Sequence, residues 1–472
     1  MPMIRPAKSF GLLALTAGLL LTACQQQLVE TTKPSLPITW SATVPQDADI
    51  WPAAEWWRAF GSEELDQLIT AARTGNYDIT AAAARVLQAE AQTRLAGVDL
   101  LPSVDLGASA ARAGGTGTEH KTTNNFGISL GASYEVDFWG KNRAHLSAAQ
   151  ESLKASVYDQ ETVALTVTAA VATTYFQVLS LRERLVIARL NLSNAGELLK
   201  LVESRVHNGA VSPLDLARQN AVVAQQRANI PPLEQQEHNA RSALATLLGK
   251  PPEAFDIAAD KLEMITFPQV APGLPSELLI RRPDIASAEA QLRAANADIA
   301  VARAAFFPSI QLTGSGGLQS ASLSALFDNG LIYNLAVSLT RPVFDAGRLA
   351  ANEDLAIARH DELVQQYHAT IINAFADVET TLGTIQSTTE QQTYLKEELE
   401  QSKNAYHLAE NRYKEGAEDL TTVLDAQRTL YQSQDQYSQI KYTRLLALIS
   451  LYRSLGGGWK ADNSGNLVSR QN

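Results

Sequence analysis

The sequence has few of the residues that catalytic or metal sites require. Its 472 residues include one cysteine, three methionines and seven scattered histidines. There is no His-Glu-x-x-His pattern, no cysteine cluster and no nucleophile elbow at a strand-to-helix turn. A net charge of −11 argues against a nucleic-acid partner. We therefore expect neither an enzyme nor a protein that binds a metal or a soluble cofactor.

Proline and glycine are almost absent from two long stretches. Residues 141–207 contain no proline and only Gly196, and residues 348–415 contain no proline and only Gly383. Apolar residues in the second stretch recur every three or four positions, which predicts a helix with one apolar seam. A helix of that size would be on the order of 100 Å long. Ordinary globular helices are much shorter, so such helices must lie along partners or cross a gap.

Long apolar runs are also missing beyond the N-terminus, where no run reaches the roughly 18 residues that a membrane-spanning helix needs. The N-terminus itself has basic Arg5 and Lys8, an apolar stretch over 10–21 and a lipobox ending in Cys24. We predict a lipoprotein signal peptide over 1–23, with a diacylglycerol and an N-acyl chain on Cys24. Gln25 favours the outer membrane over the inner one. The alternative is a free thiol within an ordinary signal peptide.

The chain repeats itself at an offset of about 207 residues. The run Phe307-Pro308-Ser309 matches Leu101-Pro102-Ser103, and Arg412 with Gly416 matches Arg205 with Gly209 (412 − 205 = 207). These separate landmarks indicate a tandem duplication of a helix, two strands, a long helix, a turn and a return helix.

The expected segments follow from this duplication. A tail and equatorial segment covers 24–61, an equatorial connector 250–276 and a C-terminal tail 456–472. Repeat 1 covers 62–249, with a first helix over 62–100, strands near 103–111 and 126–138, a long helix over 141–207 and a return helix over 213–248. Repeat 2 covers 277–455, with a first helix from 278 to 305, strands near 309–318 and 333–344, a long helix over 348–415 and a return helix over 420–454.

Each expected strand pair has the pattern of a membrane strand. Apolar residues from Phe126 to Phe138 alternate with glycine, serine and acidic residues, so one face suits lipid and the other suits water. A soluble sandwich is the alternative. Four strands cannot close a barrel, and an open sheet edge is not tolerated in lipid. Further copies of the chain must complete the sheet, as a dimer with eight strands or a trimer with twelve.

Aromatic residues gather at the strand ends next to the long helices. We predict that they form a belt at the periplasmic membrane interface. Filling of the core at the helix–strand junctions is the alternative. The predicted belt consists of Phe138, Trp139, Phe306, Phe307 and Phe344.

At several motifs the sequence resembles the TolC/OprM family of outer-membrane efflux ducts, in its NodT-type lipoprotein branch. The motifs are Trp56-Trp57 with Phe60, the run 134–141, Leu274-Pro275-Ser276, Arg281-Arg282-Pro283-Asp284, the run 306–309, the run 342–348 and Leu424-Asp425-Ala426-Gln427-Arg428. The resemblance runs from the lipobox to about Trp459. It implies a mainly α protein with a membrane β-barrel, assembled as a homotrimer with a 12-stranded β-barrel continuous with a periplasmic α-helical barrel.

The resemblance also implies a passive duct without cofactor. Its expected partners are a periplasmic adaptor protein, an inner-membrane pump of the RND or ABC type and outer-membrane lipid. By position, Arg412 and Lys414 fall on the basic tethers of the family's periplasmic gate, and Asp425 falls on an acidic ring. Asp215 is the candidate acceptor for Arg412. Thr421 replaces the bulky apolar residue of close relatives, so a hydrophobic constriction is not expected.

The exported substrate stays open at this point, with drugs, solvents, siderophores and metal ions as candidates. The low methionine and histidine content argues somewhat against metal export. A second hypothesis is a structural coiled-coil lipoprotein, a spacer or an adhesin stalk without transport activity. That alternative accounts for the long helices but not for the strands or the duplication.

Overall fold

The computed structural model describes residues 39–41, 51–114, 122–259, 262, 265–273, 275–328 and 330–460. The predicted signal peptide, Cys24 and the tail beyond Lys460 lie outside the described residues. All the described residues belong to one compact unit, and the description below concerns that unit.

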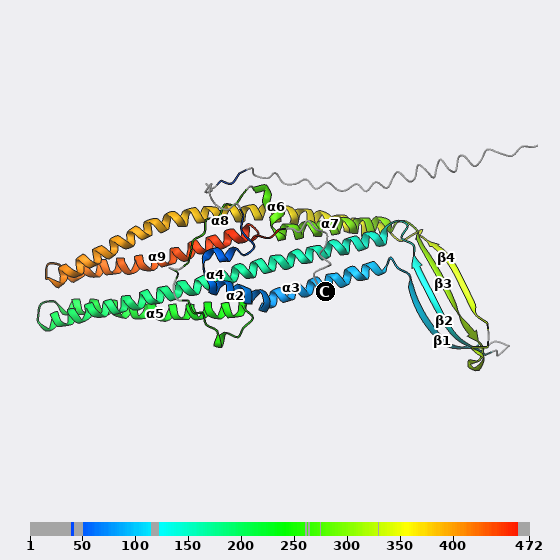
Figure 1. Ribbon diagram of the computed structural model, residues 1–472, viewed down its shortest axis with the longest axis horizontal. Helices are drawn as coiled ribbons and strands as arrows, with labels where there is room; N and C mark the ends of the chain where they lie inside the picture. Colours follow the sequence, from blue (N-terminus) through cyan, green and yellow to red (C-terminus); the bar gives the residue numbers. More distant parts are fainter. Residues whose placement is uncertain are drawn as a thin grey trace, which may run out of the picture. The chain divides into compact units, whose positions relative to one another are not determined.

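Two helices of equal length dominate the fold (Figure 1). They are α4 (Lys141–His207) and α8 (Arg348–Lys414), each of 67 residues, or about 100 Å at 1.5 Å per residue. Both begin directly after a glycine with positive φ, Gly140 at 78° and Gly347 at 85°. That left-handed conformation is open to glycine at low cost and turns the chain from strand to helix.

A return helix of 35 residues packs back on each long helix. Helix α5 (Pro213–Leu247) follows α4, and α9 (Leu420–Ser454) follows α8. The result is two hairpins, which pack together through α4 and α9. Figure 1 shows both hairpin turns at the same end of the helices, opposite the strands.

The first helix of repeat 1 is broken, so the expectation of one helix over 62–100 is wrong. After a short 3₁₀ helix, η1 (Trp56–Phe60), come α2 (Glu63–Gly75) and α3 (Tyr77–Val98). Asn76 separates them because its side chain caps α3, accepting the N–H groups of residues 78 and 79, and donates to the Leu247 carbonyl at 2.9 Å.

The first helix of repeat 2 is broken as well. In the described part of the connector before it lie the 3₁₀ turns η2 (Pro252–Ala254) and η4 (Pro275–Glu277). Helix α6 (Leu278–Arg281) then ends at Arg282, and α7 (Pro283–Ala304) begins with the proline. Arg282 is extended (φ −107°, ψ 124°), the backbone region to which a following proline restricts its neighbour.

Four strands form one antiparallel sheet in the order β1-β2-β3-β4. They are β1 (Ser103–Ala113), β2 (Thr123–Glu135), β3 (Ser309–Ser320) and β4 (Ile332–Thr340), with a 3₁₀ turn, η5 (Leu323–Ala325), between the last two. Strands β2 and β4 end earlier than the expected 138 and 344. At the first of these ends the Asp137 carboxylate accepts the N–H groups of Asn142 and Arg143, which turns the chain into α4.

The strand register places the apolar residues on one face of the sheet. Leu106 pairs with Leu130, Leu130 with Gly316, and Gly316 with Tyr333. The opposite face carries mainly glycine, serine, amide and acidic residues, such as Gly107, Ser129 and Gly317 along one row and Asp105 in the next. Leu106 is 73% exposed and Leu335 is 79% exposed in the single chain, so the apolar face lacks a cover within it.

The core lies where the hairpins and the short helices meet. Trp56, Phe60, Tyr175, Phe176 and Tyr452 pack there, with Trp56 stacked on Tyr452 at 4.9 Å. One window of α4 is long and apolar enough to cross a membrane by length and composition, although no unbroken apolar run marked it in the sequence. Half of that window is buried inside the unit, as expected for a core helix.

Candidate functional site

The two hairpin turns have the same backbone structure. In the first, the N–H of Gly209 donates to the carbonyl of Val206 at 2.9 Å, and that of Ala210 to Arg205 at 2.8 Å. In the second, Gly416 donates to Tyr413 and Ala417 to Arg412, both at 2.9 Å. Gly209 and Gly416 have φ of 70° and 79° and close their helices in the same way.

The residues of the predicted gate lie at and just after these turns. Arg412 is exposed and pairs with Glu418 of its own turn at 3.4 Å, and Lys414 pairs with Glu410 one helical turn back at 3.0 Å. Asp425 is exposed and pairs with Arg428 at 2.9 Å. Among the contacts of the described residues, the charged groups of Arg412, Lys414 and Asp425 therefore pair only with residues of their own hairpin.

Asp215 and Thr421 occupy more structured positions. Asp215 forms a capping box with Ser212 at the start of α5, and Arg218 lies 3.8 Å from its carboxylate. Thr421 accepts a hydrogen bond from Arg218 at 3.1 Å, which links the two hairpins. The structure does not bring Arg412 to Asp215 within the described part of one chain, so that pairing stays a prediction for a contact between chains.

Sequence reasoning missed Arg205, which joins the two hairpins at their turns. Its guanidinium donates to the Lys414 carbonyl at 2.9 Å and lies over the Tyr413 ring at 4.3 Å. Arg205 thus binds the C-terminal end of α8, where the helix dipole favours a cation. The signal was available, because Arg205 is the residue that matches Arg412 in the duplication.

Buried tyrosines also connect the two hairpins, along the helices rather than at the turns. The hydroxyl of Tyr431 accepts from Gln427 at 2.9 Å and donates to the Asn191 carbonyl of the first hairpin at 2.9 Å. Burial raises the pKa of Tyr431 above its ordinary value and raises the pKa of Tyr406 to about 12. Both therefore stay neutral at physiological pH, as hydrogen-bonding groups in an apolar cluster must.

Three residues of the predicted belt, Phe138, Trp139 and Phe307, form one exposed aromatic group. The Trp139 ring stacks on Phe307 at 4.6 Å, meets Phe138 edge-on at 4.8 Å, and donates its N–H to the Pro308 carbonyl at 2.8 Å. Phe344 is 88% exposed and Phe138 is 64% exposed. Phe306, beside Phe307, is half-buried. In the single chain, the exposure of Phe138 and Phe344 favours the belt over core filling, and the belt stays a prediction.

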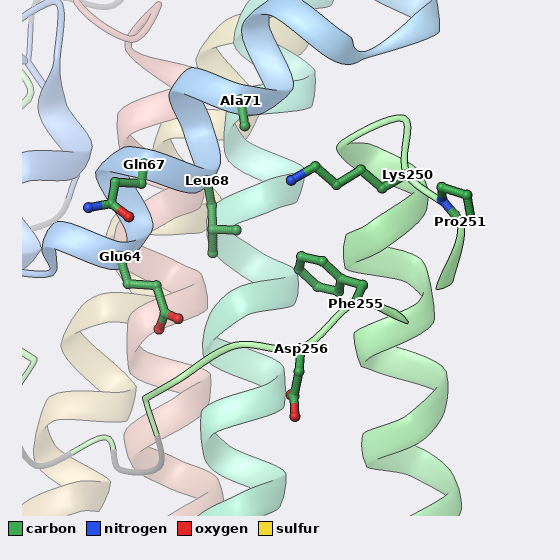
Figure 2. A pocket seen from close by; sticks show the side chains of 8 residues that line it. All are labelled: Glu64, Gln67, Leu68, Ala71, Lys250, Pro251, Phe255 and Asp256. Atoms are coloured by element: carbon green, nitrogen blue, oxygen red, sulfur yellow. The ribbon is translucent and has the colours of Figure 1, made fainter. Parts of the chain in front are cut away.

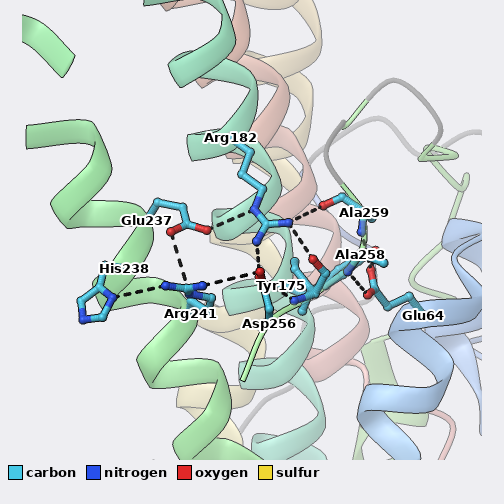
Figure 3. A network of polar contacts seen from close by, with 10 residues as sticks. Glu64, Tyr175, Arg182, Glu237, His238, Arg241, Asp256, Ala258 and Ala259 are labelled. Carbon is cyan, nitrogen blue, oxygen red and sulfur yellow. Dashed lines mark hydrogen bonds and ion pairs between the residues drawn. The ribbon is translucent and has the colours of Figure 1, made fainter. Parts of the chain in front are cut away.

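A second polar region holds the connector after α5 in place. The Arg182 guanidinium of α4 donates to the carbonyls of Ile257 at 2.7 Å and Ala259 at 3.1 Å, and it pairs with Glu237 and Asp256 (Figure 3). Glu64 of α2 accepts the N–H groups of Ala258 and Ala259. The connector is therefore tied to α2, α4 and α5.

A groove lies between α2 and the connector. The apolar part of the groove is lined by Leu68, Ala71 and Phe255. The charged residues that line it are Glu64, Asp256 and Lys250 (Figure 2). No group of three or more histidine, cysteine or acidic residues in the described part of the chain is placed to hold a metal ion.

Comparison with known proteins identifies the arrangement. The profile of the family described as "Outer membrane efflux protein" matches residues 68–250 and 274–457, one match for each repeat. This chain belongs to that family. It is 45% identical to the pyoverdine export outer membrane protein OpmQ of Pseudomonas aeruginosa over 439 residues, covering 91% of this chain and 92% of OpmQ.

More distant relatives have the same extent. The cation efflux system protein CusC of Escherichia coli is 32% identical over 456 residues, covering 95% of this chain and 99% of CusC. The solved structure of the outer-membrane channel OprN superposes with a TM-score of 0.84 at 29% identity, covering 91% of this chain and all of OprN.

Family membership establishes the function and the assembly of the protein, which a single chain does not show. The protein is the outer-membrane channel of a tripartite efflux system, a passive duct that is neither an enzyme nor dependent on a cofactor. Family members are trimers that work with adaptors and inner-membrane pumps. Three sheets close as a 12-stranded β-barrel in the outer membrane, and the hairpins form an α-helical barrel that extends into the periplasm. The dimer and the stalk without transport activity are thereby excluded.

Proposed function

We propose that this channel exports a siderophore or a similarly large, polar small molecule. The 45% identity to the pyoverdine exporter OpmQ along nearly the whole chain is the observation that supports this substrate class. The polar face of the strands agrees with it, because its serine and amide side chains, with the carboxylates of Asp105 and Glu135, offer hydrogen bonds to a polar cargo. Cation export is the second candidate, supported by the 32% identity to CusC.

Complementation separates these two substrates. The full-length chain is expressed in a Pseudomonas aeruginosa strain without OpmQ and in an Escherichia coli strain without CusC. We expect pyoverdine to return to the medium of the first strain, while the copper tolerance of the second does not recover. Recovery of copper tolerance without pyoverdine export would contradict the siderophore proposal.

The specific partners are part of this proposal. We infer a periplasmic adaptor that contacts the hairpins and an inner-membrane pump of the RND or ABC type. The proposed layout places the equator at residues 24–61 and 250–276, between the repeats 62–249 and 277–455. Co-purification of the trimer with candidate adaptors from the same genome tests the partner proposal directly.

The hairpin turns are the proposed gate. Arg412 and Lys414 would tether each second hairpin to the neighbouring chain, with Asp215 as an acceptor, and three copies of Asp425 would form an acidic ring that attracts cations. Both cations lie at the turn, and Arg412 is 61% exposed. With Thr421 in place of a bulky apolar residue, charges rather than an apolar constriction would keep the passage closed.

Planar-bilayer recordings test the gate. The double variant Arg412→Ala with Lys414→Ala should raise single-channel conductance, because the tethers would be lost. Arg189→Ala is the matched control, since among the described contacts Arg189 pairs with Glu234, inside the first hairpin, at 2.9 Å. Unchanged conductance in an intact trimer of the double variant would contradict the tether.

The membrane attachment is proposed on two features. Cys24 would carry the acyl chains, and the group around Trp139 and Phe344 would lie at the periplasmic interface of the membrane. Cys24→Ser should abolish labelling by a palmitate analogue while the barrel still inserts. Labelling that persists in this variant would contradict lipidation at Cys24.

A further inference from the structure

One charged side chain lies on the apolar face of the sheet, which the barrel turns to lipid. Arg112 of β1 pairs in register with Asn124 of β2, in the same set of alternating positions as Leu106 and Leu130. Among the described strand positions of that face, every other side chain is uncharged. A charge on the lipid face is destabilising in the middle of a membrane, so the depth of Arg112 decides what it can do.

The strand geometry places Arg112 at the extracellular edge of the apolar band. Strand β1 runs away from the helices, and Arg112 is its last residue but one (Figure 1). The eight steps from Val104 to Arg112 (112 − 104 = 8) span about 27 Å of strand, or about 20 Å along the axis of a barrel whose strands tilt by about 40°. The apolar band of such a barrel is about 25 Å tall, so Arg112 lies at the depth of the outer-leaflet headgroups, where a charge costs little.

The neighbouring chain contributes the other half of this region. Strands β1 and β4 are the two edges of the sheet, so closing the barrel pairs β1 with β4 of the next chain. Neighbouring strands alternate in direction, and the end of β1 therefore meets the start of β4. The residues at and before that start are apolar and exposed in the single chain, with Phe327 at 76%, Leu331 at 71% and Tyr333 at 79%. In the trimer each Arg112 thus has an apolar segment of the next chain beside it.

The chemistry of this region matches an acylated phospholipid headgroup. Arg112 is exposed, and neither an ion pair nor a hydrogen bond joins its side chain to another described residue. A guanidinium binds phosphate through two parallel hydrogen bonds, and the amide of Asn124 beside it is a further donor. The outer leaflet of an outer membrane consists largely of lipopolysaccharide, whose lipid A part carries phosphate groups on an acylated disaccharide. A cation next to an apolar segment offers partners to both parts of that molecule.

We propose that Arg112 binds a phosphate group of lipid A, with Phe327 and Leu331 of the neighbouring chain in contact with its acyl chains. The site occurs three times around the trimer. It lies on the outside of the barrel, so it is independent of the exported substrate. The bound lipid fixes the barrel in the outer leaflet, at the extracellular end of the strands.

Titration of the full-length trimer with lipid A tests the proposal. Native mass spectrometry in detergent measures the binding of lipid A that carries both phosphates and of the same lipid after dephosphorylation. We expect the phosphorylated form to bind about fivefold more tightly, the scale of one arginine beside an anionic headgroup. Arg112→Gln removes the charge and should lose this preference, while Arg112→Lys should keep part of it. A preference that persists in full in Arg112→Gln would overturn the inference.

Three controls define the site. Arg189→Ala removes an exposed arginine of α4 and should keep the preference. Phe327→Ser should weaken the binding of both forms of lipid A alike, because it removes apolar contact and no charge, and an unchanged affinity would refute the role of the neighbouring chain. Displacement of lipid A by inorganic phosphate, but not by chloride at equal ionic strength, would show a simple anion site and overturn the assignment to lipid A.

Trimers that resist SDS show that each variant has assembled. Should Arg112→Gln fail to assemble, the unmodified channel decides, since it should still distinguish the two forms of lipid A. Equal affinity for both forms would then overturn the inference, and this result would leave the proposed export function untouched.

Discussion

Arg182 should control how firmly the connector after α5 is held, and Arg182→Met removes its guanidinium while keeping much of its apolar stem. The side chain is 15% exposed. The substitution deletes the hydrogen bonds to the Ile257 and Ala259 carbonyls and the ion pairs with Glu237 and Asp256. Glu237, only 14% exposed, would keep its charge beside Arg241 alone.

The cost follows from these contacts. A hydrogen bond to a charged group typically contributes about 1.5–3 kcal/mol, and Arg182 makes two of them to the connector carbonyls. The pair with the largely exposed Asp256 adds little because water screens it, and the pair with Glu237 joins α4 to α5 and does not resist opening of the connector. We take about 3 kcal/mol for local opening of the connector, which corresponds to roughly a 100-fold larger open population.

Proteolysis of the assembled trimer in detergent measures this opening. Thermolysin cleavage beside Phe255 depends on the open population when opening is faster than cleavage, so the variant should be cut about 100-fold faster. Arg241→Met is the matched control, because Arg241 lies 3.6 Å from Asp256 and 4.0 Å from Glu237 and contacts neither connector carbonyl. Equal cleavage of the two variants would refute the assigned role of Arg182.

Low pH should weaken the contact between Arg182 and Asp256. Burial acts to raise the pKa of Asp256, but hydrogen bonds from the Ile257 N–H and from Arg182 hold that pKa below its ordinary value. A lowered carboxyl pKa contributes stability above the unfolded value of about 3.9, and this contribution is lost as the pH falls below it. Cleavage of the unmodified channel should therefore accelerate below about pH 4 with an acid-stable protease, and Arg182→Met should show a smaller acceleration.

Three further predictions concern other parts of the fold. Burial raises the pKa of Tyr175 to about 12, so the folded state favours the neutral tyrosine. The thermal stability should therefore fall as the pH rises from 10 to 12, and this fall should be smaller in Tyr175→Phe. Gly249 has φ of 68°, and a Cβ there would lie 2.2 Å from the Gly75 carbonyl oxygen, so Gly249→Ala should lower the Tm by several degrees or prevent assembly, whereas an unchanged Tm would contradict the contact. Trp139→Ala removes the stack on Phe307 and should cost about 1 kcal/mol or more in urea unfolding from lipid vesicles, with no loss if the rings do not interact.

The long helices and the duplication could be read from the sequence, because both depend on local patterns. The near-absence of proline and glycine predicted helices over 141–207 and 348–415, the second supported by the three-to-four spacing of its apolar residues, and the structure has Lys141–His207 and Arg348–Lys414. The alternation in the strands likewise predicted an apolar and a polar face. Such periodicities depend only on the residues of the segment itself.

The breaks and strand ends could not be read in that way. Asn76 looks like an ordinary polar residue of a helix until the fold brings the Leu247 carbonyl beside it. Residues 136–138 continue the strand pattern, yet the chain leaves the sheet because Asp137 captures two N–H groups at the start of α4. In each case a side chain hydrogen-bonds with backbone groups outside its own helix or strand, and the periodicity of that segment does not show such a contact.

The sequence by itself determined the duplicated helix–strand unit, because periodicity and the spacing of repeated landmarks suffice for it. Only the tertiary structure decided which charges meet at the turns. In the structure, Arg205 and not Arg412 contacts the Tyr413 ring and the Lys414 carbonyl. These residues are more than 200 positions apart in the sequence, so only the packing of the two hairpins brings them together.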